Sequence, residues 1–174
     1  MIIIGVDPGL ITTGYGLIET SGRDPVLLEG GVIRGGPGNY SLEERLASLY
    51  DGFMEVLDQF PSEALALEQL YSHYEHPTTA ILMGHARGVL CLAAAKMNVP
   101  VFHYASTQIK SSLTGNGHAS KDQMQRVIQM RLRLKSIPTP HDIADALAAA
   151  LCHHSAARSP FLMAARDSKH CKSM

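Results

Sequence analysis

The sequence IIIGVDPGLITTGYGLIE, at residues 2–19, decides the fold that we expect for this chain. Residues 2–7 are mostly β-branched and are followed by Pro8 and Gly9, so they predict a buried strand that ends in a turn. Residues 13–19 predict a second short strand. The short connection favours an antiparallel pair, because a crossover to a parallel strand needs a dozen residues or more.

The rest of the chain predicts further strands and helices. Apolar runs predict strands at residues 27–34, 64–68 and 99–104. Apolar residues at helical spacing predict helices at residues 41–60, 78–97, 106–113, 120–134 and 142–154. A meander followed by alternating helices and strands predicts an α/β fold, with a mixed five-stranded sheet and helices on both faces. Right-handed crossovers should place the first and fourth strands side by side.

Composition and charge predict one soluble domain that meets a polyanion. We place this domain at residues 1–157, with residues 158–174 as a flexible basic tail. Charges interrupt the long apolar runs, so we expect no membrane span, and three widely spaced cysteines favour the reducing cytoplasm. Residues 1–76 carry 3 basic and 12 acidic side chains, whereas residues 77–174 carry 12 basic and 4 acidic ones. This asymmetry suggests a basic face for a polyanion, and a solvated basic helix would explain it equally well.

Four acidic residues stand where apolar side chains would be expected. Asp7 ends the first predicted strand and Glu68 ends the fourth, which should be its neighbour. Asp142 and Asp145 are three residues apart on the last helix, so they share a face. Because buried carboxylates must be paired or bound to metal, we predict that the four acids hold Mg²⁺, for which Mn²⁺ would substitute. Two ions about 3.5–4 Å apart would support phosphodiester hydrolysis.

Each acid also has a purely structural explanation. Asp7 before Pro-Gly is typical of a turn, and Glu68 would suit an edge strand with its side chain in water. Asp142 would stabilise the helix dipole from the third helical position if Thr139 were the N-cap residue. His141 lies one turn before the fourth acid and is a further candidate for a metal ligand or a proton carrier.

Four motifs give the chain a resemblance to a known family. In sequence order, GVDPGLITTGYGLIE, LALEQLY, the ARG of HARGVL and PHDIADALAAAL resemble the RuvC family of bacterial Holliday-junction resolvases, over residues 2–157. The resemblance implies a ribonuclease-H-like fold and an endonuclease that cuts four-way DNA junctions in recombination and repair. It assigns the four catalytic acids to Asp7, Glu68, Asp142 and Asp145. Some relatives have a histidine at the position of the third acid, which keeps His141 as an alternative ligand.

The same resemblance implies how the protein meets its substrate. Tyr71, in EQLY, matches an aromatic residue that engages the junction, and Lys110 and Lys121 match two lysines that contact DNA phosphates. Arg87, in the ARG motif, is interpreted as structural or as a contact to the backbone. The family also implies a homodimer, which suits a junction with two equivalent strands, and RuvA and RuvB as partners. We expect residues 78–97 to contribute to the dimer interface.

Three other functions remain open from the sequence. A nuclease that acts on RNA–DNA hybrids would use the same fold and metal chemistry, and only its substrate would differ in shape. The DPG and TGYG motifs also occur in actin-like ATP-binding proteins, but those proteins need a second domain of similar size. Nine histidines suggest a zinc protein, yet no cysteine or histidine pair has zinc-ligand spacing.

Overall fold

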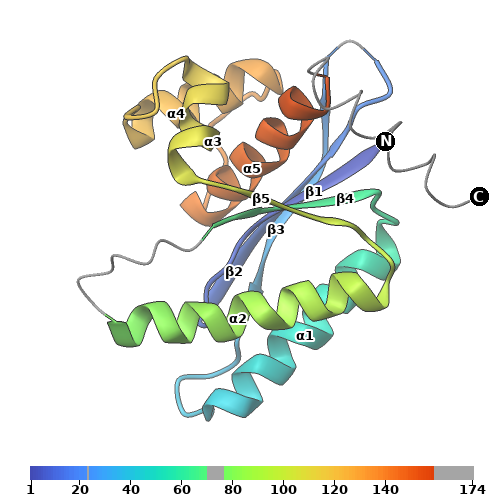
Figure 1. The fold of residues 1–174 in the computed structure, drawn as a ribbon, viewed down its shortest axis with the longest axis vertical. Helices are drawn as coiled ribbons and strands as arrows, with labels where there is room; N and C mark the ends of the chain where they lie inside the picture. The colour runs from blue at the N-terminus through green and yellow to red at the C-terminus, as the bar shows by residue number, and fades with distance from the viewer. Residues whose placement is uncertain (23, 70–76, 159–174) are drawn as a thin grey trace, which may run out of the picture.

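The computed structural model describes residues 1–22, 24–69 and 77–158, and a five-stranded sheet forms its centre (Figure 1). The strands are β1 (Ile2–Asp7), β2 (Thr12–Glu19), β3 (Val26–Arg34), β4 (Ala64–Glu68) and β5 (Val101–Tyr104). They lie in the order β3-β2-β1-β4-β5. The first three strands are antiparallel, whereas β4 is parallel to β1 and β5 is parallel to β4. The predicted mixed sheet and the predicted neighbours β1 and β4 are therefore confirmed.

Helices cover both faces of the sheet. The described residues form α1 (Leu42–Gln59), α2 (Pro77–Lys96), α3 (Ser106–Thr114), α4 (Lys121–Arg131) and α5 (His141–Ala157). α1 and α2 lie on one face, and α3, α4 and α5 lie on the other (Figure 1). Successive strand residues point to opposite faces, so Ile3 packs into the α5 core and Ile4 into the α1–α2 core. The predicted layers are confirmed.

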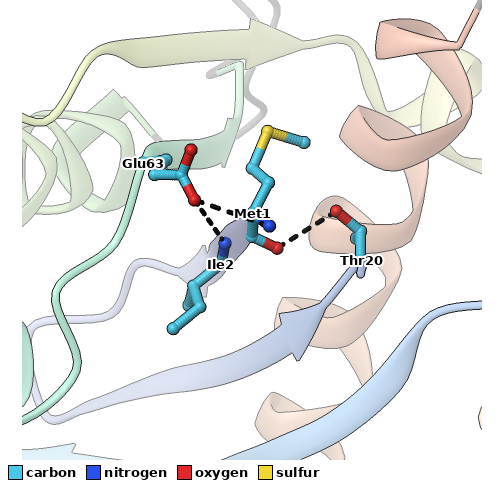
Figure 2. Close-up of polar contacts among 4 residues, drawn as sticks. All are labelled: Met1, Ile2, Thr20 and Glu63. Carbon is cyan, nitrogen blue, oxygen red and sulfur yellow. Dashed lines mark hydrogen bonds and ion pairs between the residues drawn. The ribbon is translucent and has the colours of Figure 1, made fainter. Parts of the chain in front are cut away.

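Polar contacts fix the start of β1 to its surroundings (Figure 2). The backbone N–H of Ile2 donates to the Glu63 carboxylate at 3.1 Å, and the ammonium group of Met1 lies 3.5 Å from the same carboxylate. The Thr20 hydroxyl donates to the Met1 carbonyl at 3.0 Å. A slip of one residue would turn every side chain of β1 to the other face. These contacts and the two cores therefore determine where Asp7 is placed.

Helix α2 is more apolar than its position in the fold requires. By length and composition, the segment Thr78–Lys96 is long and apolar enough to cross a membrane. This differs from our expectation that the chain has no such segment. One such helix is weak evidence for a span, because the core helix of a soluble protein passes the same test. α2 packs against α1 and buries Ala86, Leu90 and Ala93 in the core. Only 22% of the segment is buried, however, and Ile81 is 60% exposed. α2 therefore presents an apolar surface that the sheet does not use.

Helix α4 is shorter than the sequence pattern predicts. The apolar and basic spacing predicts a helix over residues 120–134, but α4 ends at Arg131. Arg133 adopts a left-handed backbone conformation, with a φ of 52°, which stops the helix. At the other end the Ser120 side chain accepts from the backbone N–H of Gln123 and completes a capping box.

Candidate active site

Asp7 and Glu68 end two neighbouring parallel strands. β1 and β4 pair through Val6 and Leu67, so the next residue of each strand emerges at the same edge of the sheet. Arg87 of α2 donates from Nε to the backbone carbonyl of Glu68 at 3.3 Å, which supports the end of β4. The first two predicted acids are therefore side by side.

Helix α5 can approach this edge closely because the strands beneath it carry glycine. A methyl group on Gly5 would overlap the carbonyl oxygen of Ala146, and one on Gly14 would overlap the carbonyl oxygen of Asp142. Gly14 is also the register partner of Asp7. Asp142 therefore lies against the rung of the sheet that contains Asp7.

The first turn of α5 differs from the prediction. Pro140, not Thr139, is the N-cap residue, and its side chain makes no capping hydrogen bond. His141 is the first helical residue, so Asp142 is the second rather than the third. An acid in the first turn still interacts favourably with the helix dipole. Asp142 can therefore stabilise the start of α5 and still lie beside the other acids.

Three of the four predicted acids line one cavity of about 210 Å³. Its wall contains three acids and two lysines, namely Asp7, Glu68, Asp145, Lys110 and Lys121. Asp142 is not among the described residues that line it, although its charge acts on both Asp7 and Asp145. The cavity therefore joins negative groups that suit cations to positive groups that suit a phosphate.

The acids of this cavity hold their protons unusually tightly. Burial is the main cause that raises the pKa of Asp7 to about 7. Three neighbouring acids reinforce this rise and Lys121 opposes it; in decreasing order the acids are Asp145, Glu68 and Asp142. Burial also raises the pKa of Glu68 and the pKa of Asp145. Such a cluster ionises less readily than separate carboxyl groups do, because burial and each neighbouring negative charge disfavour the charged form.

The chemistry of these donors fits a hard divalent cation. Within residues 1–22, 24–69 and 77–158, no three His, Cys, Asp or Glu side chains already form a group that could hold a metal ion. Burial first and the neighbouring acids second raise the pKa of Asp7, so a bound cation would stabilise the ionised carboxylates. Carboxylate oxygens match the preference of Mg²⁺ and Mn²⁺ rather than that of zinc.

The other predicted site residues lie in different places. His141 is exposed outside the cavity wall, and its Nδ1 lies 2.6 Å from the amide nitrogen of Gln125. Tyr71 lies outside the described residues, as does the predicted tail from residue 159 onward. Arg87 contacts the β4 backbone and also places Nη2 2.6 Å from Nδ1 of His103, which agrees with a structural interpretation.

The sequence did not point to Ser106, which also lines the cavity. Its side chain hydrogen-bonds the Glu68 carboxylate and lowers the pKa of that group against the effect of burial. Ser106 begins α3 directly after β5, and β5 pairs with β4 so that Tyr104 is the register partner of Glu68. A lone serine after an apolar strand carries no signal until this pairing is known.

Comparison with known proteins places the chain in a family. The sequence model described as "Crossover junction endodeoxyribonuclease RuvC" matches residues 3–153. A protein of that name from Rhodopirellula baltica is 51% identical over 158 residues, which cover 91% of this chain and 88% of that protein. Another from Thermotoga maritima is 46% identical over 151 residues, which cover 87% and 89%.

A solved structure has the same fold. "T. thermophilus RuvC in complex with Holliday junction substrate" superposes with a TM-score of 0.85 at 35% identity, over 91% of this chain and 95% of that one. The ribonuclease-H-like fold that the sequence motifs implied is thereby confirmed. By sequence and by fold, this chain belongs to the RuvC family of crossover junction endodeoxyribonucleases.

Proposed function

We propose that this protein is an endodeoxyribonuclease that resolves four-way DNA junctions by two symmetric cuts. The observation that carries the proposal is the cavity at the ends of β1 and β4, where the half-buried Asp7 and Glu68 and the more exposed Asp145 meet two lysines. Hydrolysis of a phosphodiester needs both kinds of group, one to hold cations and one to hold the phosphate. Family membership supports a junction as the substrate, because the matching sequence model and relatives carry that substrate in their name.

Mg²⁺ is the proposed cofactor, with Mn²⁺ as a substitute and two ions at each site. Asp7, Glu68 and Asp145 would hold the ions, and Asp142 would contribute from beside the cavity. Bound divalent ions supply a water of lowered pKa and stabilise the leaving oxygen of the phosphodiester. The three carboxylates of the cavity come from β1, β4 and α5, so elements that pack in the core position them before DNA arrives.

Lys110 and Lys121 are proposed to contact phosphate oxygens beside the cut. Both line the cavity, and both act to lower the pKa of Asp145 against the effect of burial. They therefore offset part of the negative charge that would otherwise repel a phosphate. Tyr71 follows Glu68 by three positions in the sequence, and we propose that it stacks on an unpaired base of the junction.

A homodimer would provide the two active sites that symmetric cutting requires. The proposed interface is α2, because its outer side borders an open groove of about 480 Å³. This groove is lined by Leu46 of α1 and by Gly84 and Gly88 of α2, with Ile81 and Leu92 60% and 52% exposed. The apolar side of a second α2 would cover this surface. The family resemblance further implies a cytoplasmic location and RuvA and RuvB as partners.

Cleavage of a labelled synthetic four-way junction tests the proposed function. A linear duplex and an RNA–DNA hybrid of matched sequence are incubated in parallel, each with Mg²⁺ or with a chelator. We expect paired cuts in opposing strands of the junction, and no cuts with the chelator. Equal cutting of the linear duplex would contradict junction specificity, and preferential cutting of the hybrid would identify the alternative nuclease.

A further inference from the structure

A second cluster of basic side chains lies at the far end of α5. Arg131, Arg133, Arg158 and His154 line an open pocket of about 350 Å³, which we call the arginine pocket. Of the described residues around it, Asp24 is the one acid. His154, the first α5 residue of this pocket, lies nine positions after Asp145, the α5 acid that lines the catalytic cavity, or roughly 14 Å along the helix axis. The arginine pocket is therefore separate from the catalytic cavity.

Helix α4 connects the two sites. Its first residue, Lys121, lines the catalytic cavity, and its last residue, Arg131, lines the arginine pocket. Arg126, between them, lines a hollow of about 530 Å³ that shares Met130 and Arg131 with the arginine pocket. α4 and α5 lie on the same side of the sheet (Figure 1). Basic groups therefore follow α4 over about 15 Å, which is roughly four to five nucleotides of one DNA strand.

Arg133 has a backbone conformation that glycine would adopt more easily. The Leu134 N–H donates to the Gln129 carbonyl at 2.9 Å, and the Arg133 N–H donates to the Met130 carbonyl at 3.2 Å. These two bonds close the helix around a left-handed residue, where glycine is the usual choice because other residues are strained. The side chain of Arg133 is 80% exposed. Glycine at this position would therefore remove the side chain while it keeps the backbone conformation.

The charges around the arginine pocket favour an additional anion. Arg133 Nη2 lies 2.8 Å from Asp24 Oδ2, an ion pair in which both side chains are exposed. His154 is buried, and burial lowers its pKa, with further lowering by Arg158 and Arg131. The positive charge of Arg131 and Arg158, which disfavours protonation of the His154 imidazole, will attract a phosphate.

We propose that the arginine pocket binds a backbone phosphate of a junction arm whose scissile strand occupies the catalytic cavity of the same protomer. This inference rests on the proposed function, which supplies the arm. Arginine suits the role because its planar guanidinium pairs with phosphate oxygens. The competing explanation is that the arginines only stabilise the negative C-terminal ends of α4 and α5. That explanation predicts lower stability on substitution and no effect on DNA.

The test removes a negative charge from the DNA backbone and a positive charge from the arginine pocket, first separately and then together. Junctions carry one neutral methylphosphonate linkage at a time, roughly three to eight nucleotides from the cut, and dissociation constants are measured without divalent ions. With the unaltered protein, one or two linkages in this window should weaken binding by about fivefold. Arg133→Gln should bind the unmodified junction about fivefold more weakly and lose the response to those linkages, because the contact is already gone.

Three further variants separate the two explanations. Asp24→Asn removes the competing carboxylate and should bind the junction more tightly. Lys96→Gln alters an exposed lysine of α2, on the opposite side of the sheet, and should bind as the unaltered protein does. Arg133→Gly relieves the left-handed backbone, so it should keep or raise the thermal midpoint while it loses the linkage response.

The proposal would be overturned if the neutral linkages weakened binding by Arg133→Gln as much as they weaken binding by the unaltered protein. It would also be overturned if binding were weaker only in variants whose thermal midpoint is lowered. In a separate experiment, the protein is titrated with inorganic phosphate, and binding is followed by the NMR resonances of the His154 imidazole. If Arg133→Gln abolished a response to phosphate while no linkage affected binding, the pocket would bind free phosphate and the DNA assignment would be overturned. The unaltered protein is assayed on the unmodified junction in parallel, and failure to cut it there would count against the proposed function alone.

Discussion

At the residue scale, the function proposed here depends on a half-buried carboxylate, Asp7, that lies beside like charges. Burial, reinforced by three neighbouring acids, raises the pKa of Asp7 from an ordinary 3.8 to about 7. A carboxyl that binds its proton more tightly in the folded than in the unfolded state favours folding at low pH. This contribution is fully present below about pH 4 and is lost as the pH rises toward 7. A divalent cation reverses the preference, because it stabilises the ionised form.

Asp7→Asn should therefore stabilise the protein in a chelator above pH 7, by on the order of 2 kcal/mol, because the amide carries no buried charge. Below about pH 4 the variant and the unaltered protein should unfold alike. Urea unfolding across this pH range measures the difference. Asp51→Asn, on the exposed side of α1, serves as the control and should change stability by less than about 0.5 kcal/mol. Lower stability of Asp7→Asn at alkaline pH would contradict the raised pKa.

Stabilisation by Mg²⁺ should depend on pH for the same reason. We expect Mg²⁺ to raise the thermal midpoint of the unaltered protein, by an amount that shrinks as the pH falls below about 7 and Asp7 becomes protonated. Ser106→Ala should move this dependence toward higher pH, because Glu68 loses the hydrogen bond that lowers its pKa. Thermal unfolding with and without Mg²⁺ measures both effects. An Mg²⁺ effect that does not vary with pH would count against the carboxylate cluster.

At the element scale, apolar periodicity and the crossover rule were enough to predict the sheet, its helices and the pairing of β1 with β4. They also predicted that Asp7 and Glu68 would share one edge, because parallel neighbours end together. The ends of α4 and α5 were missed, since single residues such as Pro140 and Arg133 decide them. The closeness of α5 to the sheet was also missed, because it depends on what lies opposite Gly5.

Gly5→Ala should disturb the candidate site from within the core. A methyl group there overlaps the α5 backbone at Ala146, the residue after Asp145, so the helix must move away from β1. We expect a loss of stability of about 1–3 kcal/mol and a smaller stabilisation by Mg²⁺. Urea unfolding with and without Mg²⁺ measures both. Gly38→Ala is the matched control, since a methyl group on Gly38 meets nothing within 4 Å. Equal stability of the two variants would contradict the close packing.

At the scale of the whole molecule, the two sides of the sheet carry different surfaces. The side covered by α3, α4 and α5 holds the catalytic cavity and the arginine pocket. The side covered by α1 and α2 holds the apolar groove. The basic C-terminal half of the sequence predicted a surface for a polyanion, but charge counts could not locate it, because location depends on which helices pack together. Tyr71 stays a prediction from the sequence motif alone.

Leu92→Glu should weaken the proposed dimer, because it places a charge on the exposed apolar side of α2, where Leu92 is 52% exposed. Sedimentation at micromolar concentration should shift toward the monomer, while the stabilisation by Mg²⁺ persists. Val26→Glu, at a β3 residue that is 57% exposed, is the control and should leave the assembly unchanged. A monomeric unaltered protein, or an unchanged dimer of Leu92→Glu, would remove α2 from the interface.

The decisive measurement compares junction binding with junction cleavage in Asp7→Asn and Asp145→Asn. Both variants should bind a four-way junction about as tightly as the unaltered protein, while cleavage with Mg²⁺ should fall by more than about a hundredfold, because the ligands of the ions are lost. Asp51→Asn should bind and cut normally. If Asp7→Asn or Asp145→Asn cut the junction at a rate near that of the unaltered protein, these acids would not be the groups that hold the catalytic cations.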